Sequence, residues 1–263
     1  MSIAILSRIV INPINYLIDI LGLLVYTFKE TRHLLDKNKR KLFIFFFKRQ
    51  LFNTGIKAIY VNCLIAILFG MVTADRLFLL IPPSTHLIDF YAEWFVIIFI
   101  RELGPLISGF VLIARSATAI TAEIGHLKFH NEFEVLKGQK ISPIFIFLMP
   151  VFFSFPLSLL LMFFFFNFFC MGSVWIYLKL FSDNTIVLFD FITVIINHIS
   201  LTEVLILSSK AIMGGSFIGL ISIHSATMVT GRFTDISRSL SKVTTMQLLG
   251  FFVINISLSV LAY

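Results

Sequence analysis

Two charged residues, Arg101 and Glu102, stand next to each other in a mostly apolar run from Phe99 to Gly125. A charge in the hydrocarbon of a membrane costs several kcal/mol, so such groups normally face the interior of a helix bundle or a watered cavity. Neighbouring side chains on a helix point about 100° apart, so these two need separate partners. Two interpretations, which do not exclude each other, follow. The charges form interhelical ion pairs, for instance with Glu203 or Lys210, or they line a cavity that accepts a polar head group.

A break in the helix follows these charges at Gly104 and Pro105. Pro105 has no backbone N–H, so the carbonyl of Arg101, four residues earlier, loses its helical donor, and Gly104 weakens the same turn. We therefore expect a freed backbone acceptor beside the charges. The surrounding run is also too long for one straight crossing, because residues 87–122 would span about 54 Å as a single helix against about 30 Å of hydrocarbon. Either the helix bends or one end leaves the membrane.

Small residues dominate the segment after the break and predict close helix packing at its cytoplasmic end. They are Ala114, Ser116, Ala117, Thr118, Ala119, Thr121, Ala122 and Gly125. Arg115 lies among them, and we expect its long side chain to reach towards lipid phosphates.

Four residues that could ligate a metal follow in the next loop. Glu123, His126, His130 and Glu134 fall at positions i, i+3, i+7 and i+11, on one face of a helix, which superficially resembles a metal site. A short amphipathic cytoplasmic helix explains the same residues, because apolar side chains accompany them at helical spacing. We therefore predict a helix ended by Gly138, and no metal.

The composition requires a membrane protein. The chain of 263 residues is 58% hydrophobic and only 13% charged, and its mean hydropathy is +0.97, values that ordinary soluble domains do not approach. We expect an all-α polytopic membrane protein with five transmembrane helices. The windows long and apolar enough to cross a bilayer are 55–74, 87–120, 143–170, 200–224 and 245–262.

The N-terminal part of the chain is apolar but is interrupted by polar residues at short intervals, from Arg8 to Asp19. This pattern suits a helix in the membrane interface, with a sixth crossing as the alternative. The basic residues favour five crossings, because residues 1–57 hold ten of the 21 Lys and Arg and the loops 121–142 and 225–244 hold three each. Since such residues stay on the cytoplasmic side, we expect the N-terminus inside and the C-terminus outside.

No repeat or linker divides the chain, so we read residues 1–263 as one domain. Residues 1–45 would form the interfacial helix and a cytoplasmic basic segment, and residues 55–263 the transmembrane helices. Pro150 and Pro156 predict that the third span is kinked or begins before Pro150. Gly215 and Gly219 form a small-xxx-small pair, which predicts the close approach of another helix.

Several other features carry little chemistry. Phenylalanine tracts such as 163–166 are interpreted as lipid-facing bulk. Cys63 and Cys170 match no disulfide or metal spacing, and we expect them in the core or facing lipid. No G-x-x-x-x-G-K-[ST] loop is present, so we do not expect this chain to hydrolyse ATP itself. The placement of the basic residues in loops argues against binding of nucleic acid.

Taken together, the motifs resemble the MlaE-type permeases of ABC lipid transporters, a family that serves outer-membrane lipid asymmetry and has a chloroplast counterpart. The likeness covers roughly residues 45–260. The matching stretches are RQLFNTG (49–55), RELGP (101–105), ARSATAITAEIG (114–125), Ser142-Pro143 with Pro150, and the closing pair of spans. The most specific part is RELGP followed ten residues later by Arg115 and then by TAEIG.

The resemblance implies a homodimeric permease of the inner membrane of a Gram-negative-type bacterium, with the plastid inner envelope as the alternative. It implies transport of phospholipids between that membrane and a periplasmic MCE-domain protein, contributing to outer-membrane lipid asymmetry. The other partners would be a cytoplasmic ABC ATPase, which would bind the ATP while this chain holds no cofactor, and often a small STAS-domain protein.

Site residues also follow from the resemblance, residue by residue. Arg101, Glu102 and Leu103 would line the family's lipid cavity at the dimer interface. The helix that couples to the ATPase would fall on Glu123–Lys137. Its coupling residues would be Glu123, His126, Lys128, His130, Glu134 and Lys137.

The chain departs from the family at three places that bear on ATPase docking. Many relatives have Gly-Arg in place of Ala114-Arg115, Asp-Pro in place of Ser142-Pro143, and Pro-Arg in place of Pro150-Val151. The competing functions are a polytopic membrane enzyme and a membrane scaffold that transports nothing. The enzyme lacks support, because neither H-E-x-x-H nor G-x-S-x-G occurs.

Overall fold

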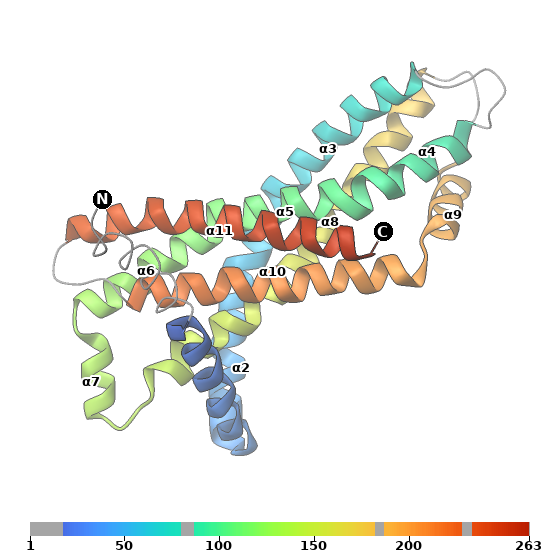
Figure 1. Cartoon of the computed structure of the whole chain (residues 1–263). Helices are drawn as coiled ribbons and strands as arrows, with labels where there is room; N and C mark the ends of the chain where they lie inside the picture. Colours follow the sequence, from blue (N-terminus) through green and yellow to red (C-terminus); the bar gives the residue numbers. More distant parts are fainter. Residues whose placement is uncertain (1–17, 80–86, 182–186, 228–232, 263) are drawn as a thin grey trace.

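The chain folds into long helices that run across one another, as a computed structural model shows (Figure 1). The structure describes residues 18–79, 87–181, 187–227 and 233–262, and no strand occurs within these ranges. A helical segment over residues 18–30 comes first. The further elements are η1 (Thr31–Leu35), α2 (Lys37–Leu51), η2 (Phe52–Ile56), α3 (Lys57–Phe78), α4 (Leu87–Phe95), η3 (Val96–Leu103), α5 (Gly104–Leu112), η4 (Ile113–Ala117), α6 (Thr118–Phe129), α7 (Glu132–Gly138), η5 (Ile144–Leu148), α8 (Met149–Phe181), α9 (Leu188–His198), α10 (Leu201–Thr227) and α11 (Phe233–Ala262).

Within these described ranges, five continuous helices are long and apolar enough to cross a membrane, which confirms the five-span prediction. They cover Lys37–Leu77, Asp89–Phe129, Ile144–Phe181, Leu201–Thr227 and Leu240–Ala262. The first two have 41 residues each, or about 60 Å at 1.5 Å per residue, so each extends well beyond the hydrocarbon. The basic residues of α2 and the first predicted span belong to one uninterrupted helix, because α2, η2 and α3 follow each other without a break.

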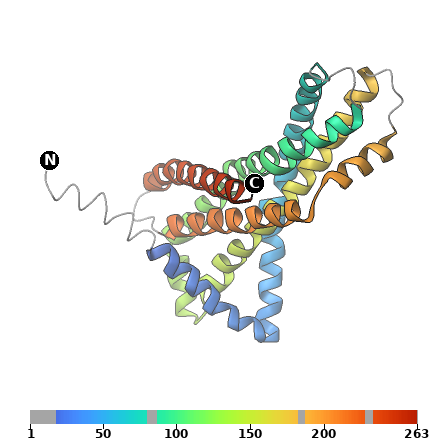
Figure 2. The same ribbon diagram turned by 45° about the vertical axis from the view of Figure 1, so that its right-hand side comes forward.

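The interfacial helix predicted for the N-terminus lies partly outside the described residues, which begin at residue 18. Residues 18–30 are helical and lead into the lower end of α2 (Figure 2). Leu23 and Leu24 pack against the core, whereas Leu21 and Val25 are exposed apolar side chains. An exposed apolar face of this kind suits a helix that lies against lipid.

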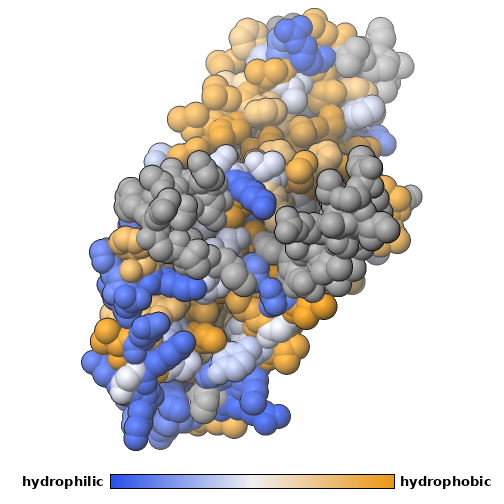
Figure 3. Space-filling view, turned by 60° about the vertical axis from the view of Figure 1, so that its left-hand side comes forward, coloured by the Kyte–Doolittle hydropathy of each residue, from blue (hydrophilic) through white to orange (hydrophobic). Residues whose placement is uncertain are grey.

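Hydrophilic side chains gather at one end of the molecule, which is the lower end in Figure 3, where Figure 1 places α2 and α7. This end carries the basic residues of α2, including Lys48 and Arg49 in its last turn. The positive-inside rule predicts that this is the cytoplasmic end.

Helix α8 lies at the centre of the fold and packs against α3 on one side and α10 on another. Phe155, Phe163 and Phe166 of α8 are fully buried, whereas Phe164 is 65% exposed. The interpretation of the 163–166 tract as lipid-facing bulk was therefore wrong for half of it, since a helix turns successive residues by about 100° and buries one side. Cys170, on the same helix, is a buried free thiol.

Four segments of π-helix, in which N–H groups bond five residues back, interrupt the long helices within the described residues. They are η2, η3, η4 and η5, and each overlaps or directly follows one of the motif stretches of the sequence. The predicted break at Gly104 and Pro105 thus takes the form of a π segment, η3, that passes directly into α5. The early start predicted for the third span likewise takes the form of η5, directly before α8, which begins one residue before Pro150.

Two glycines from different helices form a slot for one aromatic ring. Gly109 of α5 and Gly214 of α10 both face Phe251 of α11, whose side chain is completely buried. A Cβ atom added at Gly214 would lie 2.5 Å from the Phe251 ring, closer than real Cβ atoms come. The close approach predicted at Gly215 is confirmed, because a Cβ atom there would lie 2.5 Å from the Cα atom of Pro156 in α8.

We predict that Gly109→Ala and Gly214→Ala each destabilise the protein by about 1–3 kcal/mol, because the added methyl group overpacks the Phe251 ring. Thermal unfolding of the detergent-purified protein measures this. Gly172→Ala is the matched control, since nothing lies within 4 Å of a Cβ atom built there. Equal unfolding temperatures for all three variants would show that no slot exists.

Candidate functional site: a charged cluster beside a helix break

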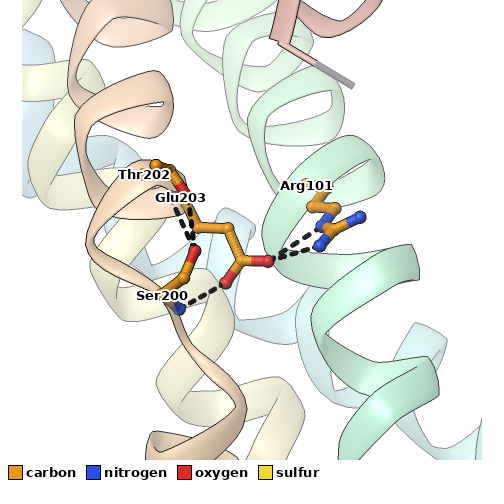
Figure 4. Close-up of polar contacts among 4 residues, drawn as sticks. All are labelled: Arg101, Ser200, Thr202 and Glu203. Atoms are coloured by element: carbon orange, nitrogen blue, oxygen red, sulfur yellow. Dashed lines mark hydrogen bonds and ion pairs between the residues drawn. The ribbon is translucent and has the colours of Figure 1, made fainter.

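The charged cluster joins η3 to α10. The Arg101 guanidinium donates to one carboxylate oxygen of Glu203, Oε1, from Nε at 3.0 Å and from Nη2 at 2.6 Å (Figure 4). The Glu203 side chain is 3% exposed and that of Arg101 is 30% exposed. The interhelical ion pair considered for Arg101 is therefore present, and a nearly buried carboxylate holds a guanidinium that remains partly accessible.

Glu203 is itself fixed by the start of its helix. Its second oxygen, Oε2, accepts the backbone N–H of Ser200 at 2.9 Å, and the Ser200 hydroxyl lies 3.4 Å from the backbone nitrogen of Glu203. This reciprocal arrangement is a capping box, in which Ser and Glu three residues apart satisfy the first N–H groups of a helix. Both carboxylate oxygens of Glu203 are thus engaged, which fixes the direction from which it meets Arg101.

The carbonyl beside the break also has a partner. Lys210 Nζ lies 2.5 Å from the Arg101 carbonyl oxygen, the acceptor that Pro105 deprives of its usual helical donor. The same ammonium lies 3.8 Å from Glu102 Oε2, and the Ser259 hydroxyl of α11 donates to this oxygen at 3.1 Å. Arg101 and Glu102 therefore have the separate partners that their positions on a helix require.

The cluster has an inner and an outer half. The side chains of Glu203 and Lys210 are 3% and 1% exposed, whereas those of Arg101 and Glu102 are 30% and 41% exposed. The two ion pairs balance the charges of the four residues. The recess beside the Arg101–Glu203 pair is too narrow for a water molecule. Ile100 and Leu207 are among the residues that line it. This part of the chain therefore presents a charged surface rather than a closed cavity.

Leu103, the third residue predicted to contact lipid, is half-buried and packs against the apolar cluster around α4 and α8. Gly104 follows it at the end of η3 and bonds through its N–H to the Phe99 carbonyl, five residues back. A Cβ atom at Gly104 would lie 2.5 Å from that carbonyl oxygen, so the break requires glycine here.

Hydroxyl groups connect two other motif stretches. The Ser116 hydroxyl donates to the Thr54 carbonyl oxygen at 2.7 Å, and the hydroxyls of Thr54 and Ser158 lie 2.8 Å apart. Thr54 and Ser116 belong to the π segments η2 and η4, and Ser158 to α8. Such bonds satisfy backbone groups of irregular helix at membrane depth. These bonds show that the small residue Ser116 serves close packing between helices.

Arg115 contacts an aromatic ring. Its guanidinium carbon lies 5.4 Å from the centre of the Tyr60 ring of α3, a cation–π contact.

The predicted cytoplasmic helix over Glu123–Lys137 is two helices. Helix α6 ends at Phe129 and α7 begins at Glu132, because Asn131 adopts a left-handed conformation with φ 57°. Glu134 therefore does not continue the helix face of Glu123, and the one-face argument was wrong. The end of α7 at Gly138 is confirmed. No group of three potential metal ligands is arranged to hold an ion in the parts of the chain that the structure describes.

The six predicted coupling residues fall into two sets. Glu123, His130, Glu134 and Lys137 are exposed, while His126 and Lys128 are half-buried, and the Lys128 ammonium donates to the carbonyl of Thr227 at the end of α10. Glu123 also lines a small recess of about 40 Å³ between α2, α6 and η5, together with Arg49 and Gln50. The exposed set lies at the end of the molecule with the basic residues of α2.

Sequence reasoning missed Ser200, Ser259, Thr54 and Ser158. The first had a signal, since Ser200-x-x-Glu203 before an apolar run is the pattern of a capping box. The other three had none, because each acts through the packing of helices far apart in the chain.

We predict that Arg101→Met destabilises the protein more than the double variant Arg101→Met/Glu203→Leu. The single change leaves a nearly buried carboxylate without its guanidinium, which typically costs about 3–5 kcal/mol, whereas replacing both partners by apolar groups is often close to neutral. Chemical or thermal unfolding of both proteins measures the difference. Lys179→Met, which removes an exposed charge from α8, is the control. A double variant less stable than the single one would refute the buried pair.

Comparison with known families identifies the family of the chain. The family model described as Permease MlaE matches residues 47–261, from the last turn of α2 almost to the end of α11. A search of curated proteins gives no match. The chain belongs to the MlaE permease family, and it is thus a multi-pass membrane protein that acts as a permease subunit in ABC-type lipid transport.

Proposed function

We propose that two copies of this chain form a phospholipid permease of a bacterial inner membrane, in which Arg101 and Glu102 meet the lipid head group. Lipid would pass between this membrane and a periplasmic MCE-domain protein and so contribute to outer-membrane asymmetry. One observation carries the proposal. Two partly exposed charges lie within a membrane-spanning helix and are fixed from behind by two nearly buried charges, Glu203 and Lys210.

Arg101 is suited to a phosphate group. A guanidinium presents N–H donors in a planar fork that matches phosphate oxygens, and the pair with Glu203 holds this fork in a defined position. A side chain that is already ordered loses less entropy when it binds a ligand. Glu102, held by Lys210 and Ser259, offers an acceptor for the ammonium group of a zwitterionic head group beside it.

The narrow recess beside Arg101 favours a dimer. A single chain leaves no volume for a head group behind the charged pair, so a lipid must be held on the exposed side of Arg101 and Glu102. Only a second wall on that side would enclose it and exclude water. A second copy of the chain supplies a wall with the same charges.

The continuous helix Asp89–Phe129 offers a route from the cytoplasm to these charges. Glu123 lies 22 residues after Arg101, or about 33 Å along the helix. We propose that a cytoplasmic ABC ATPase, which binds the ATP, docks on the exposed residues of α6 and α7 and on the recess shared by Glu123 and Arg49. Closure of the ATPase would then move the helix that carries Arg101. A small STAS-domain protein is a further partner on this side.

The lipid role of Arg101 is tested with the double variant Arg101→Met/Glu203→Leu, which should fold and yet not transport. We expect transfer of fluorescent phospholipid by the complex in proteoliposomes to fall at least about tenfold, since a hydrogen bond to a charged group contributes about 1.5–3 kcal/mol. Lys242→Met, which removes an exposed charge from α11, is the control. Transfer at the rate of the unaltered complex by a folded double variant would refute the assigned role.

The coupling role is tested by charge reversal at the cytoplasmic end. We expect Glu123→Arg combined with Glu134→Arg to lower lipid-stimulated ATP hydrolysis about tenfold or more, because repulsion replaces attraction at the docking surface. Unfolding temperature and co-purifying lipid should not change. Asp190→Arg reverses an exposed acidic residue of α9, far from α6 and α7, and should have no effect. Hydrolysis unaffected by the double reversal would place the ATPase elsewhere.

A further inference from the structure

An apolar cavity of about 390 Å³ lies between α3, α8 and α9, away from the charged cluster. Its walls include Met71 of α3, Phe168, Gly172 and Trp175 of α8, and Leu188 and Ile192 of α9. This volume is within the range of about 300–1,000 Å³ typical of small-molecule sites. The cavity lies along the outer part of the membrane-spanning helix Ile144–Phe181.

The cavity exists because α9 packs chiefly against α4 and makes few contacts with α8 (Figure 1). Phe191 and Ile195 of α9 are buried in the apolar cluster, whereas Leu188 and Ile192 face the cavity. At Gly172 of α8 the space continues to the backbone, since nothing lies within 4 Å of a Cβ atom built there. The fold thus leaves a gap that is lined mainly by apolar side chains.

The outer end of the cavity carries a cation. The Lys179 ammonium lies 5.0 Å from the centre of the Trp175 ring, one helical turn beyond the cavity, and the Lys179 side chain is exposed. Tryptophan and lysine together are typical of the level of lipid head groups. The apolar walls match an acyl chain, and the Lys179 ammonium matches an anionic head group.

The length and the apolar lining of the cavity suit an acyl chain. A helix of another protein, with its side chains, is about 10–12 Å across. An extended hydrocarbon chain is much thinner and can follow the walls from Phe168 to Ile176, about 12 Å along α8.

We propose that this cavity binds one acyl chain of a phospholipid with an anionic head group, whose phosphate meets Lys179. This site is separate from the surface formed by Arg101 and Glu102. A lipid can bind in it even when the protein transports no lipid. Transfer of an acyl chain from bilayer to cavity removes little water, because lipid tails are already apolar. Selection must therefore come from the head group and from the fit of the chain, which makes both testable by single substitutions.

The experiment uses a phosphatidylglycerol with a photoreactive diazirine on one acyl chain, in nanodiscs that contain the full-length protein. Mass spectrometry then maps the labelled peptides. We expect labelling of 168–176, and we expect Gly172→Leu, which fills the cavity without displacing backbone, to lower it about fivefold or more. Gly22→Leu is the matched control, because a Cβ atom at Gly22 also meets nothing within 4 Å.

A second variant tests the head group. In the unaltered protein, unlabelled phosphatidylglycerol should compete better than phosphatidylcholine, and Lys179→Gln should abolish this preference while the unfolding temperature stays the same. Labelling that persists in Gly172→Leu, or equal competition by the two lipids in the unaltered protein, would overturn the proposal. Labelling of the isolated chain that disappears in the assembled complex would also overturn it, because a partner protein would then occupy the cavity.

Discussion

A backbone carbonyl that has lost its usual α-helical donor, within a helix apolar enough to cross a membrane, is the constraint on which the charged cluster depends. Pro105 deprives the Arg101 carbonyl of its usual donor, and the buried ammonium of Lys210 supplies another. A buried ammonium in turn requires an anion, which Glu102 provides at 3.8 Å. Arg101 then turns to Glu203, which the capping box of α10 already holds. Each polar group in this series therefore serves as the hydrogen-bond or ion-pair partner of another group in the cluster.

The same constraint explains why the hydroxyl groups lie where they do. Carbonyl groups of a π segment can accept hydrogen bonds from donors outside the helix. In η2, the Thr54 carbonyl accepts one from the Ser116 hydroxyl. Ser158 approaches the same segment because Gly55 has no side chain to prevent it, with the Ser158 hydroxyl oxygen 2.9 Å from a Cβ atom built at Gly55. The irregular helix segments and the polar side chains therefore belong to one arrangement, in which η2, η4 and α8 are bound to each other near the cytoplasmic end.

Much of the fold could be predicted from the sequence, because long apolar windows and the distribution of Lys and Arg depend on the bilayer rather than on tertiary contacts. Glu203 and Lys210 were identifiable as partners for the same reason, since charges inside a membrane need one another. The helix boundary at Asn131 was not predictable from helical spacing, because the residues on both sides fit one helix and only a left-handed residue ends it. Ser259 and Ser158 lie on α11 and α8. No local sequence pattern determines how far these helices are shifted along their neighbours.

The two π segments of the helix Asp89–Phe129 have a geometric consequence for this helix. Each inserts about one residue into the regular winding, which rotates everything beyond it by about 100°. After η3 and η4 the rotation is about 200°, so side chains that a helical wheel places on one face of α4 and α6 lie on nearly opposite faces. Arg101 and Glu123 cannot be assigned to a common face by counting residues. The loss of a single residue from either segment would turn the cytoplasmic half of the helix away from its present neighbours while leaving its length almost unchanged.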